Sequence, residues 1–92
     1  MISEPLASAA TSGAGWKSTA LSRNTKELHF YLDYDCYVAC TGLSGAPAQN
    51  GAKYTAGVTH RIPCMGALYV HHKRVGGSDA TLYGTCLTGS QR

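Results

Sequence analysis

The chain has 92 residues, of which 43% are hydrophobic and 14% are charged, and its net charge is +3. A chain of this length forms one domain with a thin stability margin, because it buries only about 60–65% of its unfolded surface. The eight Lys and Arg residues are scattered apart from a cluster at 71–74, and so lack the dense basic stripe typical of a nucleic-acid-binding protein. There is no apolar run of about eighteen residues and no visible signal peptide, so we expect neither a membrane span nor export. Synthesis in the cytoplasm would keep the thiols reduced.

The low content of charged residues is the first indication of an assembly component. Globular domains contain about 25% charged residues, well above the 14% found here. A surface poor in charge tends to be covered by partner molecules.

Residues 1–15 are small and polar, are interrupted by Pro5 and two glycines, and lack an apolar stripe. They predict a flexible N-terminal arm, either frayed or ordered only against a neighbouring subunit with Leu6 and Trp16 as anchors. Residues 16–88 are expected to form a β-sandwich domain, and residues 89–92 a loose C-terminus.

From residue 16 onward the apolar residues alternate with period two. Leu28, Phe30 and Leu32 share one face of a strand, and Cys36, Val38 and Cys40 share a face of the next. Strands are expected over residues 17–22, 27–33, 36–40, 53–56, 58–62, 67–72 and 81–87. The fold class predicted is therefore all-β, a small antiparallel sandwich or barrel of six to seven strands with an extended N-terminal arm.

The four cysteines do not match a zinc-site pattern. Cys36 and Cys40 lie within a strand, while Cys64 and Cys86 have no partner two to four residues away. We interpret them first as core thiols, with a disulfide formed in an oxidising medium and a metal site as the alternatives.

The histidines do not indicate a metal site either. His71 and His72 are adjacent in a strand and would face opposite sides, so they cannot chelate one ion together. His29 and His71 oppose the apolar alternation and are predicted to be solvent-side or interface residues.

Sequence patterns of common enzyme sites are absent. The chain has no G-x-S-x-G and no phosphate-binding loop, and Asp33 and Asp35 are not followed by the rest of a calcium loop. We expect neither an enzyme nor a cofactor.

Tyrosine-bearing strands are the remaining feature. Tyrosine offers a broad apolar area with a polar tip at low entropic cost, and it is therefore favoured at contact surfaces, although strands also favour it generally. The predicted protein-interface residues are Leu6, Trp16, Tyr31, Tyr37, Tyr69, His71 and Tyr83.

Residues 17–87, led by Trp16, resemble the small β-sandwich accessory proteins of tailed-bacteriophage virions. The segments that carry the resemblance are TKELHFYLDYDCYVAC, GAPAQNGAKYTAGVTHRIPC and GALYVHHKRVGGSDATLYGTCL. It implies a structural role, with no catalytic residues.

The expected function is therefore that of a virion protein that binds a capsid surface and stabilises the particle, as a decoration or cement protein. Its partners would be the major capsid protein or another virion protein, together with further copies of the chain. A neck or tail component, a glycan- or host-surface-binding module and a small zinc protein are the alternatives.

Overall fold

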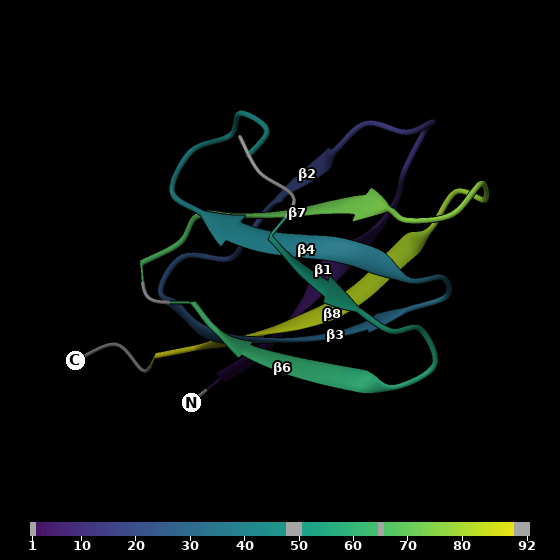
Figure 1. Cartoon of the computed structure of the whole chain (residues 1–92). Coiled ribbons are helices and arrows are strands. Elements are labelled where there is room, and N and C mark those ends of the chain that lie inside the picture. Colours follow the sequence, from purple (N-terminus) through teal and green to yellow (C-terminus); the bar gives the residue numbers. More distant parts are fainter. Residues whose placement is uncertain (1, 48–50, 65, 90–92) are drawn as a thin grey trace.

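The computed structural model describes residues 2–47, 51–64 and 66–89, which form two antiparallel four-stranded sheets (Figure 1). The strands are β1 (Ile2–Ala10), β2 (Lys17–Ala20), β3 (Thr25–Leu32), β4 (Cys36–Thr41), β5 (Ala52–Tyr54), β6 (Thr59–Pro63), β7 (Tyr69–Arg74) and β8 (Thr81–Thr88). One sheet has the order β1-β8-β3-β6 and the other the order β2-β7-β4-β5. The all-β prediction is confirmed. The sheets are not closed into a barrel, and the described residues contain eight strands where six or seven were expected.

The two sheets pack face to face around one core, in a sandwich-like arrangement. The alternating residues predicted to face inward do so, since Leu28, Phe30 and Leu32 of β3 meet Cys36 and Val38 of β4, all at most 3% exposed. Burying an apolar side chain stabilises the fold by about 1.5–3 kcal/mol. The core is thus built from the inward faces of strands of both sheets.

A cluster of three rings closes the core beside β5 and β6. Phe30 packs edge-on against Tyr54 with ring centroids 5.2 Å apart, and His60 lies 5.3 Å from Phe30 and 5.0 Å from Tyr54. Tyr54 comes from one sheet and the other two rings come from the other, so the cluster joins the sheets.

The N-terminal segment is not the arm that the sequence predicted. Residues 2–10 form β1, which pairs with β8 from Ile2↔Thr88 to Ala10↔Thr81 with an irregularity between Leu6 and Ala9. The prediction failed because β1 is an edge strand of small residues. An edge strand tolerates a proline and gains its order from the backbone ladder, without apolar alternation.

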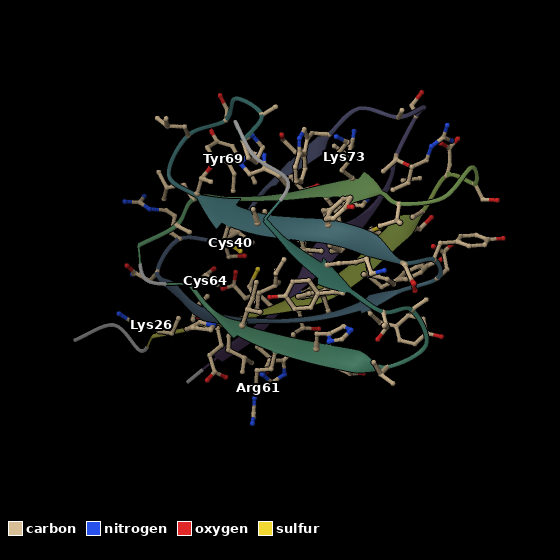
Figure 2. All side chains as sticks on the ribbon, in the orientation of Figure 1. Lys26, Cys40, Arg61, Cys64, Tyr69 and Lys73 are labelled. Atoms are coloured by element: carbon tan, nitrogen blue, oxygen red, sulfur yellow. The ribbon has the colours of Figure 1, made fainter. Side chains whose placement is uncertain are left out.

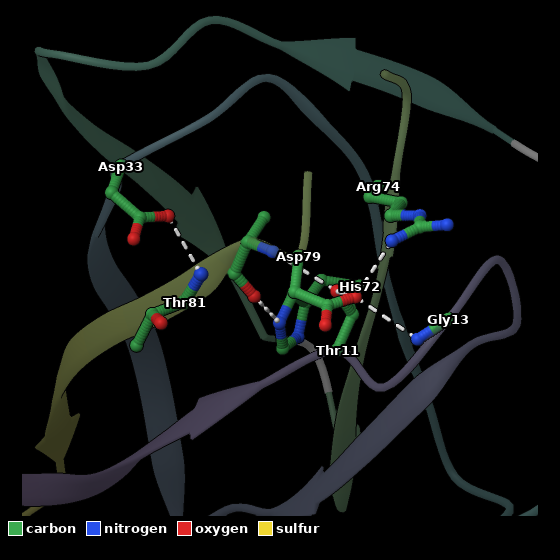
Figure 3. Close-up of polar contacts among 8 residues, drawn as sticks. Thr11, Gly13, Asp33, His72, Arg74, Asp79 and Thr81 are labelled. Carbon is green, nitrogen blue, oxygen red and sulfur yellow. Dashed lines mark hydrogen bonds and ion pairs between the residues drawn. The ribbon is translucent and has the colours of Figure 1, made fainter. Parts of the chain in front are cut away.

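The loop after β1 is held by polar contacts that Figure 3 shows. The Thr11 amide donates to the Ala80 carbonyl, and the Ala80 amide donates to Thr11 Oγ1, both at 2.9 Å. Asp79 Oδ1 accepts from Thr11 Oγ1, from the Gly13 amide and from Arg74 Nη1, at 3.3, 3.0 and 2.8 Å. These bonds, and that of the Gly13 amide above all, stabilise the charged carboxylate and hold the pKa of Asp79 below its usual range.

At the other end of the chain, only Gly89 of the segment 89–92 is among the described residues. Its amide donates to the Asn24 carbonyl at 3.0 Å. No helix among the described residues has the length and apolar character to span a membrane.

Candidate interaction faces

The predicted interface residues divide between the two outer faces of the molecule. Trp16, Tyr37 and Tyr69 lie on the outer face of the β2-β7-β4-β5 sheet, while Tyr31 and Tyr83 lie on the outer face of the β1-β8-β3-β6 sheet. We call these the β7 face and the β8 face. Figure 2 shows Tyr69 and Lys73 pointing away from the core on one side and Arg61 on the opposite side.

Leu6 belongs to neither face, which corrects its prediction as an interface residue. It is 9% exposed and packs into the core over Gly84, because β1 turns this side chain toward the second sheet.

Lysines accompany the aromatic rings on the β7 face. Tyr37 is paired across strands with Lys53 on one side and with Lys73 on the other. The Lys73 ammonium lies 5.8 Å from the centre of the Trp16 ring, a cation–π distance. No Asp or Glu is found among the strand residues that the structure places on this face. The β7 face is therefore positively charged.

His71 lies at the centre of the β7 face but is not the exposed residue that the alternation suggested. It is fully covered, although it points outward from its strand. Its Nδ1 lies 2.6 Å from Ser18 Oγ and its Nε2 lies 2.7 Å from Thr41 Oγ1. Flanking side chains from β2 and β4 thus enclose the ring, which strand periodicity alone does not reveal.

The hydrogen bonds define which nitrogen of His71 carries the proton. Thr41 Oγ1 donates its proton to the Leu43 carbonyl at 2.8 Å, so it accepts from His71 Nε2–H. Nδ1 then accepts from the Ser18 hydroxyl. Burial lowers the pKa of His71, which keeps the ring neutral at pH 7. The two hydrogen bonds of the ring join β7 to β2 on one side and to β4 on the other, and so restrain the centre of the β7 face.

His72 faces the opposite way, into the core, as the sequence predicted. It is fully buried, and its Nε2 lies 3.2 Å from the Ala80 carbonyl, which accepts its proton. Burial lowers its pKa as well. The two adjacent histidines therefore lie on opposite sides of β7, and each has its own structural contacts.

The β8 face carries an exposed tyrosine pair. Tyr31 and Tyr83 are cross-strand neighbours, 42% and 47% exposed, with ring centroids 6.3 Å apart. They border a shallow hollow of about 520 Å³ that His29, Thr59 and Thr85 also line. His29 is held by Glu27, whose Oε1 lies 3.2 Å from His29 Nε2. This face combines aromatic surface and polar groups with one acidic side chain, Glu27, and one basic side chain, Arg61.

The remaining polar candidates have structural roles. Asp33 Oδ1 accepts from the Thr81 amide at 2.7 Å (Figure 3), and Asp35 Oδ1 accepts from the Ala56 amide at 2.8 Å. This aspartate pair thus holds the turn after β3 against neighbouring segments. Within the described part of the chain, no group of three or more His, Cys, Asp and Glu side chains is placed to hold a metal ion.

The chain matches no protein-family model, and no curated protein and no solved structure shows significant similarity to it.

Sequence reasoning missed the lysines that complete the β7 face. The alternation that puts Tyr69 and His71 on one face of β7 continues to Lys73, so it could have placed Lys73 on the same face. Lys53 could not be placed in this way, because only the register between β4 and β5 sets it beside Tyr37.

Proposed function

We propose that this protein is a non-enzymatic structural subunit of a virus particle that binds an acidic patch of the capsid protein through its β7 face. The observation that carries the proposal is the grouping of three half-buried rings with two lysines on a face whose described strand residues include no Asp or Glu. Aromatic rings with a basic surround supply contact area and charge complementarity together.

The rigidity of the β7 face favours binding through it. The hydrogen bonds of the His71 ring with the hydroxyls of Ser18 and Thr41 fix three neighbouring strands, so this face loses little conformational freedom on association. The Lys73 ammonium also contacts the Trp16 ring, which restrains both side chains. Pre-organisation of this kind leaves more of the contact energy for affinity.

The assignment to a virion rests on the sequence resemblance and on composition. A domain of 92 residues with few charges gains stability when many copies are bound to a larger shell. Because residues 2–10 are paired with β8, contacts between copies would use the faces and edges of the sheets and not an N-terminal arm.

The proposal is tested by charge reversal with a matched control. Particles produced by the encoding genome without this chain are mixed with the purified protein and sedimented. The Lys53→Glu/Lys73→Glu double variant should bind about tenfold or more weakly than the wild type, because it places four carboxylate oxygens on the contact face. The Lys26→Glu/Arg61→Glu double variant changes net charge equally on the other sheet and should bind as the wild type does.

Equal binding by the two double variants, or no co-sedimentation of the wild type, would contradict the proposal. Binding of only a few copies per particle would move the subunit from the capsid surface to the neck or tail.

A glycan- or host-surface-binding module is the second candidate, favoured by the tyrosine-bordered hollow on the β8 face. Two exposed rings 6.3 Å apart beside His29 and Thr85 suit a sugar, which stacks on rings and bonds to polar groups. A glycan array probed with the wild type and with Tyr83→Ala tests it. Binding that Tyr83→Ala removes would support this function, and no binding by the wild type would exclude it for the sugars tested.

A further inference from the structure

Two cysteines from opposite sheets face each other at one end of the core. Cys40 lies in β4, Cys64 follows β6, and their sulfur atoms are 3.9 Å apart. Figure 2 shows the two side chains between the sheets, pointing toward one another. Both are free thiols in this structure. A disulfide needs sulfur atoms about 2.0 Å apart, which side-chain rotation and a small approach of the sheets would provide.

The other two cysteines are placed differently. Cys36 is four residues before Cys40 on the same strand face, roughly 13 Å away along β4, and its thiol donates to the Tyr34 carbonyl at 3.4 Å. Cys86 is fully buried on β8 and lies near enough to raise the pKa of both Cys40 and Cys64, but among the described residues only Cys40 and Cys64 have sulfur atoms in hydrogen-bond contact. The geometry therefore selects one pair among the four thiols.

Each member of this pair lines a surface hollow, and Cys40 is the more exposed of the two. Cys40 is half-buried and lines a hollow of about 300 Å³, while Cys64 lines a neighbouring one of about 410 Å³. Gly66 and Ala67 border both hollows, which therefore adjoin each other. Burial and the neighbouring thiol raise the pKa of Cys40 to about 12. The reactive thiolate is therefore scarce at neutral pH, and the pair reacts slowly.

We propose that Cys40 and Cys64 form a disulfide that joins the two sheets when the protein meets a low-molecular-weight disulfide in an oxidising medium. The half-buried Cys40 thiolate attacks one sulfur of the small disulfide, forms a mixed disulfide and releases one thiolate. The Cys64 thiolate then attacks the Cys40 sulfur and releases the second. The two cysteines are oxidised, the small disulfide is reduced to two thiols, and these take up the two protons that the cysteines lost.

The cross-link would close the chain between positions 24 apart in sequence and tie β4 to the end of β6. Cross-linking a loop of this size restricts the unfolded chain, and we expect the midpoint of thermal unfolding to rise by roughly 10–20 °C. The thiol form would be the state inside a reducing cell, and the cross-linked form the more stable state outside it.

The test exposes the full-length wild type to glutathione disulfide at pH 8, with a dithiothreitol-treated sample as reference. We expect a mass loss of two hydrogen atoms, a Cys40–Cys64 peptide in a non-reducing digest, and the higher unfolding temperature. Cys40→Ala and Cys64→Ala should each abolish the cross-link, whereas Cys36→Ala and Cys86→Ala should retain it.

The wild-type digest decides the matter even where a variant fails to fold. Four free thiols after prolonged oxidation, a stable glutathione adduct without closure, or a bond between a different pair would overturn the proposal.

Discussion

Leu6 and Gly84 give a direct test of whether β1 is part of the fold. Leu6 is 9% exposed and sits over Gly84, and a Cβ added to Gly84 would lie 3.1 Å from Leu6 Cδ2 and 3.3 Å from the His29 carbonyl oxygen. Leu6→Ala removes three carbons, at about 0.8 kcal/mol for each buried methylene. We expect a loss of about 2 kcal/mol, at the low end of the range for buried leucines because the site is at the sheet edge. In thermal unfolding this corresponds to about 10 °C.

The energetic coupling between Leu6 and Gly84 tests the same contact more specifically. Gly84→Ala alone should cost about 1 kcal/mol, since tight contacts outweigh the gain from replacing glycine in a strand. With Leu6→Ala present, the 3.1 Å contact disappears but the 3.3 Å contact with the His29 carbonyl oxygen remains, so Gly84→Ala should cost about half as much, a favourable coupling of about 0.5 kcal/mol. Urea unfolding followed by circular dichroism under reducing conditions measures the double-mutant cycle. Leu43→Ala is the matched control, because Leu43 is 76% exposed. If Leu6→Ala and Leu43→Ala had the same small effect, residues 2–10 would not be held against β8.

Three further predictions concern buried polar groups. Burial lowers the pKa of His72 below its ordinary 6.5, so the unfolded chain binds more protons and stability should fall as pH drops below about 6.5. His72 contributes at most about 1.4 kcal/mol per pH unit to this slope, and His71, whose pKa is also lowered, adds to it. Urea midpoints between pH 7.5 and 5.5 should show this slope, and a His72→Gln variant with an unchanged slope would refute it. Thr11→Val leaves the buried Ala80 amide without its acceptor and should lower the free energy of unfolding by about 1–3 kcal/mol. Thermal unfolding measures this loss, and an unchanged unfolding temperature would contradict the prediction. Thr19→Val should instead be neutral or stabilising by about 1 kcal/mol, because the buried Thr19 hydroxyl has no hydrogen-bond partner within the described part of the chain. A loss of stability as large as that of Thr11→Val would contradict this prediction.

The core strands were predictable because burial on one face leaves a period-two pattern. β3 and β4 carry that pattern clearly, and their inward residues were identified from it. β1 was not predictable, because an edge strand with a single inward leucine has no such pattern and is ordered by its backbone pairing with β8.

The candidate faces could be predicted only in part. The sequence indicated which tyrosines point outward, but it did not give the order of the strands. Only the structure shows that β4 and β7 belong to one sheet and β3 and β8 to the other. The tyrosines therefore divided between two faces in a way that spacing could not show. The contact between Cys40 and Cys64 was hidden for the same reason, since it depends on how the sheets face each other.

The central claim, that the β7 face is the contact surface, is tested most directly by lysine labelling of the protein free and bound in purified particles. An amine-reactive reagent and mass spectrometry report the labelling of each lysine. The account predicts that Lys53 and Lys73 are protected in the particle, whereas Lys26 at the start of β3 is labelled equally in both states. Unchanged labelling of Lys53 and Lys73 in the particle, or protection of Lys26 alone, would contradict it.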